Sequence, residues 1–472
     1  LPFARRFLLL VFGDLTSIVD NPLASHRNVA QRTTAAMSQR NLLLIGGTAL
    51  LASAGLAVIA MSSRNNNNKK KKKPAFKPTR IPVAGTIAKY RLTSIIRPEG
   101  HFVGGVTAFD AVDTGLENDT TFSDFMSSNK TNQTVCYCFD VSARVLVFLS
   151  CPSREALWRE PFLDRGIRKL ASEDVFICSF ETAHAYVREN PKPRPDATLQ
   201  WIWNTGRCGS TLMSRVMVAS GSAVSLSEPW WFDELCFAID DGALPEAELD
   251  ELVKTLHVVD FKLASDMWPE ATVFSMNPKG KGHPVRPSIL RAFPDGKHMF
   301  MYRDTRKVVE SFGSIFSNNM PWYIKFAMNL GLGGPPPINK KAFSDPRLSE
   351  MFESGDLRLP KRLNPIAQRI TAMWVDGVSS WIRLRESEPL LGDSVTIRMD
   401  EFVTKDLDKR RENVRAVLKS VGIEGKESIE LGMTAFNKHS QAGTRMATSS
   451  ASAGTKKFLT AEDADSIAEF VA

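Results

Sequence analysis

Residues 201–213 read Trp-Ile-Trp-Asn-Thr-Gly-Arg-Cys-Gly-Ser-Thr-Leu-Met. The apolar start of this stretch predicts a buried strand, the two glycines predict a tight turn, and the Ser-Thr pair predicts the beginning of a helix. In such a turn, several backbone N–H groups face one point beside the positive end of the helix dipole. The stretch therefore predicts a phosphate-binding loop, although an ordinary glycine turn between a strand and a helix has the same composition.

The loop lacks the lysine of the Walker A motif. In that motif, GxxxxGK[ST], the lysine stands directly before Ser or Thr, but Gly209 stands there in this sequence. ATP hydrolysis with the usual Mg²⁺ arrangement therefore loses support. The cation of this loop is Arg207, whose planar guanidinium suits an anionic oxygen on the 5′ side of a nucleotide.

Short apolar runs alternate with helical patterns after a proline-rich linker, residues 190–195. We predict strands over residues 198–203, 271–276, 298–302 and 394–398, and helices over residues 210–219, 246–257, 305–316, 366–386 and 409–421. Short buried strands that alternate with helices indicate a parallel sheet covered on both faces. The predicted fold class is α/β, with a central parallel sheet in residues 195–472. A strand-rich α+β accessory region, residues 84–190, precedes it.

A second strand–helix unit carries an arginine and a serine. Residues 298–312 read His-Met-Phe-Met-Tyr-Arg-Asp-Thr-Arg-Lys-Val-Val-Glu-Ser-Phe, so a strand delivers Arg303 and a helix delivers Ser311 eight residues later. Arginine neutralises a phosphate, and a serine hydroxyl fixes the position of that phosphate. The alternative is a surface ion pair of Arg303 with Asp304 or Glu310.

These two motifs resemble those of the sulfotransferases that use 3′-phosphoadenosine 5′-phosphosulfate (PAPS). Residues 206–211 are similar to the family's 5′-phosphosulfate loop, with Gly206 where the family has proline. Arg303 and Ser311 are similar to its 3′-phosphate motif, with Thr305 at the place of another proline. The loop is nearest to the arginine-containing versions in Golgi tyrosylprotein sulfotransferases and bacterial trehalose sulfotransferases. The resemblance implies a P-loop NTPase-like sulfotransferase fold.

The resemblance also implies a reaction and a set of site residues. PAPS would donate a sulfuryl group to a hydroxyl of an unidentified acceptor, which is a carbohydrate, a protein tyrosine or a small molecule, and no metal is expected. Arg207 would stabilise the leaving phosphate, and Glu228 would be the general base, with a structural glutamate before a helix as the alternative. The implied cofactor-binding residues are Gly206, Arg207, Cys208, Gly209, Ser210, Thr211, Arg303, Ser311, Gln441, Gly443, Thr444 and Arg445.

Other residues near these motifs have two interpretations each. Residues 230–232 (Trp-Trp-Phe) form either an acceptor-binding wall or part of the core. Lys279 and Lys281 follow a strand and are candidates to assist the sulfuryl group. The Gly/Pro-rich insertion, residues 314–345, is either a lid over the acceptor or a loop, and residues 439–445 are either a nucleotide-covering loop or part of a flexible tail.

Residues 42–61 are uncharged and predominantly apolar, and they have the length of one membrane-spanning helix. A cleaved signal sequence shows a similar pattern. The Asn/Lys-rich run 65–73 follows as a solvated linker, so residues 1–83 are expected to be an N-terminal tail with a membrane span. A translation start at Met37 would give the layout of a signal anchor.

Two patterns conflict on membrane orientation. Eight basic residues follow the span and three precede it in the flanking sequence, which favours a cytosolic C-terminal part. Three N-x-S/T sequons, at Asn118, Asn129 and Asn132, instead suit a lumenal loop, although such triplets also arise by chance in a Thr/Asn/Ser-rich loop. We expect a single-pass Golgi protein with a lumenal catalytic domain.

The net charge of +8 is concentrated in the tail. Residues 1–83 hold 13 basic residues against Asp14 and Asp20 and carry +11, so the remaining chain carries −3. The folded part therefore gives no indication of nucleic-acid binding. The six cysteines show neither zinc-ligand spacing nor the density of a disulfide framework.

Two other functions remain open from the sequence. One is a nucleotide kinase or hydrolase on a related P-loop fold, against which the missing Walker lysine argues. The other is a membrane-tethered binding protein that keeps the fold without turnover.

Overall fold

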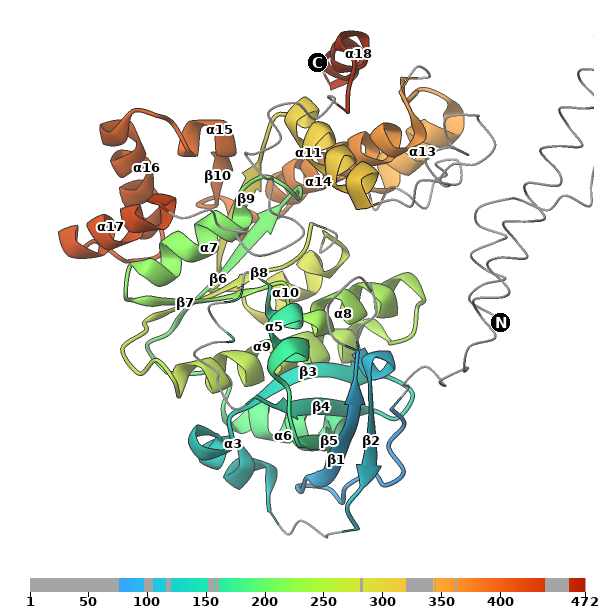
Figure 1. Cartoon of the computed structure of the whole chain (residues 1–472), viewed down its shortest axis with the longest axis vertical. Helices are drawn as coiled ribbons and strands as arrows, with labels where there is room; N and C mark the ends of the chain where they lie inside the picture. The colour runs from blue at the N-terminus through green and yellow to red at the C-terminus, as the bar shows by residue number, and fades with distance from the viewer. Residues whose placement is uncertain are drawn as a thin grey trace, which may run out of the picture. The chain divides into compact units, whose positions relative to one another are not determined.

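A computed structural model describes residues 76–96, 105–115, 120–151, 157, 160, 162–280, 283–319, 343, 345–360, 363–437 and 458–471. These residues belong to one compact unit, Pro74–Ala472. The unit contains two five-stranded sheets, one antiparallel and one parallel, and Figure 1 shows both.

The parallel sheet is formed by the C-terminal part of the unit. Its spatial order is β10-β9-β6-β8-β7, and every neighbouring pair is parallel. The strands are Thr198–Asn204 (β6), Ala223–Ser227 (β7), Val273–Asn277 (β8), Lys297–Tyr302 (β9) and Val395–Arg398 (β10). The predicted parallel sheet is thus confirmed, and β7 is a strand that the sequence pattern did not predict.

The central strand β6 is the point at which the strand order reverses. After β6 the chain builds β7 and β8 on one side, and then crosses to build β9 and β10 on the other. In open α/β sheets, ligands bind at the carboxyl ends of the strands beside such a reversal. The topology therefore predicts that a ligand binds near the loop that follows Asn204.

Helices cover both faces of this sheet. Helices α7 (Ser210–Ala219), α16 (Leu407–Lys419) and α17 (Lys426–Met433) pack with Ile202 and Met301 in one core. Trp201, Trp203 and Phe300 point to the other face, into the core with α8 (Trp230–Asp240), α9 (Glu246–Ser265), α10 (Arg286–Ala292) and α14 (Pro365–Ser387). Successive side chains of β6 point to opposite faces of the sheet, and each face is covered by a hydrophobic core. This explains why the strand has so few polar residues.

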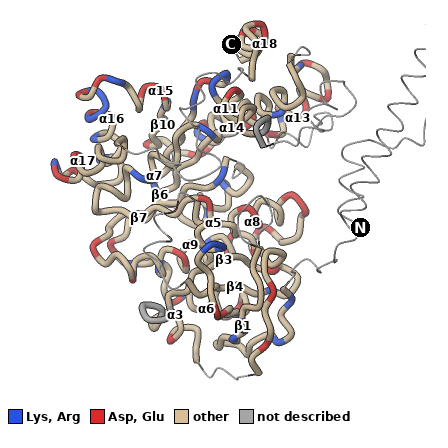
Figure 2. The backbone as a smooth tube through the Cα atoms, viewed as in Figure 1, with Lys and Arg blue, Asp and Glu red and all other residues tan. Residues whose placement is uncertain are grey.

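The remaining elements of this part lie around the carboxyl edge and at the C-terminus. The helices are α11 (Thr305–Asn319), α13 (Pro346–Ser354), α15 (Met399–Phe402) and α18 (Ala461–Val471), with the 3₁₀ turns η3 (His283–Val285), η5 (Pro389–Leu391) and η6 (Thr434–Asn437). Lys and Arg alternate with Asp and Glu along α16 and α17 (Figure 2), as is typical of a solvated surface.

The accessory region forms the antiparallel sheet, in the spatial order β2-β1-β5-β4-β3. Its strands are Ala88–Ile95 (β1), Phe109–Asp113 (β2), Thr134–Asp140 (β3), Val145–Ser150 (β4) and Asp174–Ser179 (β5). Its helices are α3 (Phe122–Asn132), α5 (Leu163–Leu170), α6 (Phe180–Glu189) and the 3₁₀ turn η2 (Gly105–Ala108).

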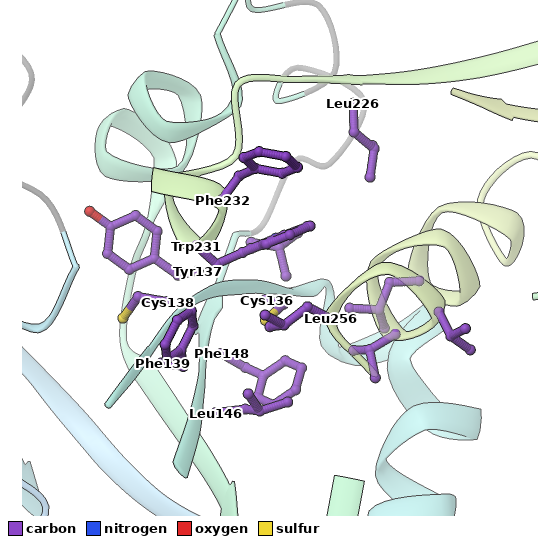
Figure 3. Packing of buried hydrophobic residues seen from close by; sticks show 14 of the residues in the cluster. Cys136, Tyr137, Cys138, Phe139, Leu146, Phe148, Leu226, Trp231, Phe232 and Leu256 are labelled. Carbon is purple, nitrogen blue, oxygen red and sulfur yellow. The ribbon is translucent and has the colours of Figure 1, made fainter. Parts of the chain in front are cut away.

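One hydrophobic core joins the two sheets through α8 and α9. Figure 3 shows Trp231 and Phe232 of α8 packed near Cys136 and Phe148 of the antiparallel sheet. Trp231 is fully buried, and its Nε1 donates to Asp260 Oδ2 over 2.6 Å. Trp231 and Phe232 therefore belong to the core, and their interpretation as an acceptor-binding wall is wrong.

Edge strand β3 is closed by a side chain from α8. The backbone N–H of Phe139 donates to the Glu234 carboxylate over 2.9 Å, and the Trp230 indole donates to the same carboxylate over 3.0 Å. Burial raises the pKa of Glu234 well above its usual value, and these two donors offset part of that effect. The accessory sheet is thus tied to α8 by hydrogen bonds as well as by packing.

Several sequence predictions fall on other parts of the chain. The expected membrane span, residues 42–61, lies outside the described residues, and none of the described helices is both long and apolar enough to cross a membrane. Asn118 also lies outside them, whereas Asn129 and Asn132 belong to α3, so the expected loop around these two sequons is wrong. The orientation and the Golgi location stay predictions.

Candidate active site

The loop after β6 has the backbone shape that the glycines allow. Gly206, Arg207 and Gly209 have φ angles of 75°, 53° and 83°, all in the left-handed region. Proline fixes φ near −65°, which explains why Gly206 replaces the proline of the family that the loop resembles. A Cβ atom on Gly209 would overlap the flexible end of the Met399 side chain, which could move, so the left-handed φ is the main reason for glycine at this position.

The turn delivers donors to one place. Helix α7 begins at Ser210, and the first N–H groups of a helix have no acceptor within it. Ser210 and Thr211 are buried at this helix start. Burial raises the pKa of the Cys208 thiol to about 11, so this side chain is neutral and adds no charge to the loop. The arrangement suits an anion held by backbone amides, hydroxyls and the helix dipole.

The two motifs predicted from the sequence meet in space. Arg207 Nε donates to Ser311 Oγ over 2.9 Å, although 104 residues separate them along the chain. Burial lowers the pKa of Arg207, the positive charge of Arg303 lowers it further, and Glu228 opposes both. Two guanidinium groups therefore lie close enough to repel each other, which an anion between them would relieve.

Arg303 lies at the carboxyl end of β9, beside an aspartate from α15. Its Nε is 3.7 Å from Asp400 Oδ1, which also accepts from Lys307 Nζ over 2.8 Å. The backbone oxygen of Arg303 accepts from Trp374 Nε1 over 2.9 Å, which fixes the main chain here. Arg303 Nε is buried and has no hydrogen-bond partner among the described residues.

The alternative pairing of Arg303 is wrong. Asp304 forms its ion pair with Arg306, over 3.2 Å. The Glu310 carboxylate accepts from the backbone N–H groups of Phe458 and Leu459, over 2.7 and 2.8 Å. Both carboxylates are thus engaged elsewhere, and the carboxylate beside the Arg303 guanidinium is that of Asp400.

Glu228 directly follows β7, at the same edge of the sheet. Its φ of 54° is unusual for a residue other than glycine, and its N–H donates to the Asn277 oxygen over 2.8 Å. Burial raises the pKa of Glu228 to about 7, and the charges of Lys279 and Arg207 limit the increase. A carboxyl group with this pKa exchanges a proton readily near neutral pH.

Lys279 lies between two carboxylates. Its Nζ contacts Asp233 and lies 4.9 Å from the centre of the Trp230 ring. Burial lowers the pKa of Lys279, but the charges of Asp233 and Glu228 raise it more, and the lysine stays protonated. Its prospective partner, Lys281, lies outside the described residues.

Sequence reasoning missed several residues of this edge. They are Ser227, Asn204 and Asn277, which join the strand ends; Asp233 and Asp400, which pair with Lys279 and Arg303; and Lys307, which also pairs with Asp400. A polar residue that ends a buried strand is the signal that could have identified Asn204 and Asn277. No local pattern identifies Asp400, because only the fold brings α15 beside β9.

Other predicted residues cannot be placed. Gln441, Gly443, Thr444 and Arg445 lie outside the described residues, as does most of the insertion 314–345. Within the part of the chain that the structure describes, no group of three or more His, Cys, Asp or Glu is arranged to hold a metal ion.

Comparison with known proteins gives distant structural similarity. The chain is similar to the sulfotransferase STF9 from Mycobacterium avium, with 12% identity over 61% of this chain and 80% of that one and a TM-score of 0.33. It is similar to mouse sulfotransferase SULT7A1 complexed with PAP, with 11% identity over 55% and 70% and a TM-score of 0.25. It is also similar to retinol dehydratase in complex with androsterone and inactive cofactor PAP, with 14% identity over 57% of this chain and 71% of that one and a TM-score of 0.24.

No family model and no curated protein matches the chain. At TM-scores below 0.5 these similarities assign neither a family nor a reaction. The functional assignment therefore depends on the residues that meet at the carboxyl ends of β6, β7, β8 and β9.

Proposed function

We propose that this protein transfers a sulfuryl group from PAPS to the hydroxyl of an acceptor. The observation that carries the proposal is the hydrogen bond from Arg207 to Ser311, with Arg303 close by. It joins a loop suited to a 5′-phosphate with a strand–helix unit suited to a second phosphate. A nucleotide with phosphates on both the 5′ and the 3′ position matches that pair of sites.

The described residues fit such a ligand. Arg303 Nε is a buried donor that needs an acceptor, and Arg207 is a partly buried cation beside another cation. In the bound state, PAPS supplies an activated sulfuryl group whose leaving group is a phosphate oxygen. Arg207 and the amides of residues 208–211 would stabilise the charge on that oxygen, and Arg303 and Ser311 would hold the 3′-phosphate.

Glu228 and Lys279 would serve the acceptor. Glu228 would accept the proton of the acceptor hydroxyl. The hydroxyl oxygen would form the new bond to sulfur as the bond between sulfur and the phosphate oxygen breaks. A pKa of about 7 leaves much of Glu228 ionised at neutral pH and still basic enough to accept the proton. Protonated Lys279 lies in the electrostatic range of Glu228 and would donate to a sulfuryl oxygen.

The other two functions are less well supported. A Walker lysine at position 209 would need a φ of 83°, which is unfavourable for any residue other than glycine, and this argues against an ATP-hydrolysing loop of the usual kind. A binding protein without turnover needs no base, whereas Glu228 has a shifted pKa and interacts electrostatically with Arg207.

Thermal unfolding of the full chain tests the proposal. Adenosine 3′,5′-bisphosphate (PAP) at 100 times its dissociation constant should stabilise the protein by about 2.7 kcal/mol, and ATP with Mg²⁺ should not. Release of PAP from PAPS in the presence of hydroxyl acceptors then measures turnover. Stabilisation by ATP–Mg²⁺ alone would favour the kinase, and binding of PAP without turnover on any acceptor would favour the binding protein.

A further inference from the structure

Three neighbouring strands end in side chains that hydrogen-bond to one another. Asn204 Nδ2 at the end of β6 donates to Asn277 Oδ1 at the end of β8, over 3.2 Å. Asn277 Nδ2 donates to Ser227 Oγ at the end of β7, also over 3.2 Å. All three residues are at least nine-tenths buried, and Asn277 is completely buried. We call these three residues the amide ladder.

The ladder has a defined direction. The backbone N–H of Gly206 donates to Asn204 Oδ1 over 2.8 Å, and an N–H group can only donate. The oxygen of the Asn204 amide is therefore fixed toward the loop, and its nitrogen must face Asn277. By the same reasoning the Asn277 nitrogen faces Ser227, so one backbone amide of the phosphate loop orients every member of the ladder.

Two members of the ladder also contact segments of the proposed site, and the third, Ser227, directly precedes Glu228. Asn204 holds Gly206, and its Nδ2 also donates over 2.7 Å to the oxygen of Pro278, which precedes Lys279. The Asn277 backbone oxygen accepts from the N–H of Glu228, whose left-handed φ requires support. The ladder thus connects the loop, the lysine and the base within the width of three strands.

We propose that Asn277 is a positioning residue that keeps Glu228 in register with the phosphate loop, with Asn204 and Ser227 as the links on either side. The inference rests on the proposed sulfuryl transfer. Glu228, the proton acceptor, and the loop that would hold the sulfuryl donor follow different strands, so catalysis needs a constant distance between them. Misplacement of a reacting group by about 1 Å costs about 10²-fold in rate. A row of buried side chains that hydrogen-bond to one another provides that constancy.

The ladder predicts graded effects along its length. Asn204→Ala leaves the Gly206 N–H without its acceptor and should weaken PAP binding as well as turnover. Ser227→Ala removes only the last link, so it should lower kcat about tenfold while PAP affinity changes less than about twofold. Asn277→Asp keeps the acceptor for Asn204 but adds a negative charge near Glu228, so the midpoint of the kcat–pH profile should move to higher pH.

Ser275→Ala is the matched control. Ser275 lies two residues before Asn277 on β8, is completely buried, and has no hydrogen-bond partner among the described residues. It should leave kcat, PAP affinity and the pH profile unchanged. The control separates the effect of a smaller side chain inside β8 from the loss of the ladder.

PAP affinity by thermal shift and kcat with PAPS as a function of pH should be measured on the full chain. A kcat loss in Ser227→Ala with intact PAP binding, together with the pH shift in Asn277→Asp, supports the positioning role. An active wild-type protein whose Ser227→Ala and Asn277→Asp variants keep the wild-type kcat and pH profile overturns the inference alone. A wild-type protein without PAP binding or turnover overturns the proposed function and the inference together.

Discussion

The carboxyl edge of the parallel sheet has two halves with opposite chemistry. At β6 and β9, Arg303 and Lys307 pair with the Asp400 carboxylate, and Arg207 lies close to Arg303. At β7 and β8, the carboxylates Glu228 and Asp233 surround one lysine, Lys279. The first half is suited to hold an anion and the second to move a proton, so one edge separates binding from acid–base chemistry.

Glu228→Gln tests the second half and should have the largest effect. The amide cannot accept the proton, so kcat should fall by about 10²- to 10⁴-fold, while PAP binding should persist because no ligand contact is removed. The kcat with PAPS and the thermal shift with PAP measure the two properties. A variant that turns over like the wild type would show that the base is another residue.

Arg207→Ala should cost turnover more than affinity. The guanidinium would stabilise charge that appears only as the phosphate leaves, and such groups contribute about 10²- to 10³-fold to kcat. The comparison requires kcat and the PAP dissociation constant in parallel. Equal losses in both would assign Arg207 to ground-state binding and remove the distinction between Arg207 and Arg303.

Arg303→Ala should mainly weaken binding of the nucleotide. Loss of one charge-assisted hydrogen bond of about 1.5–3 kcal/mol lowers affinity for PAP by about 10- to 100-fold. Arg306→Ala is the control, because this exposed arginine lies on α11 and pairs with Asp304, the residue before the helix begins. Unaltered affinity for PAP in Arg303→Ala would contradict its place in the anion-binding half.

The pH dependence of stability should show the smallest effect. The pKa of Glu228 is raised from 4.5 to about 7, so the folded protein binds a proton more tightly than the unfolded chain. The contribution of Glu228 to the free energy of unfolding is therefore largest below pH 4.5 and is lost as pH rises through about 7. Glu228→Gln should flatten this decrease in melting curves between pH 5 and 8, and identical slopes would argue against the shifted pKa.

Local signals predicted the loop and its helix from the sequence. The glycines and the Ser-Thr pair gave α7 its correct bounds, residues 210–219, because the turn and the helix start are encoded within a few residues. Strand β7 was not predicted, since two serines interrupt its apolar pattern and the strand is buried only after β8 pairs with it. The strand register that aligns Ser227 with Asn277 is likewise a property of the assembled sheet.

Charge pairing was the least predictable part of the site. Asp400 reaches Arg303 because α15 follows β10 at the same edge, 97 positions later in the chain, and no short motif encodes that proximity. Trp231 and Phe232 illustrate the reverse case, in which residues beside Glu228 in the sequence point into the core instead of the site. Residues that are close in the sequence can therefore lie in different environments where a strand ends and the next helix begins.

The hydrogen bond between Phe139 and Glu234 has a consequence for synthesis on the ribosome. Strand β3 emerges 95 residues before the carboxylate that closes its edge. At about 5–20 residues per second, this edge stays open for about 5–20 s in every nascent chain. Exposed strand edges pair readily with other chains, so β3 is a place where the nascent chain is open to intermolecular pairing until α8 has been synthesised.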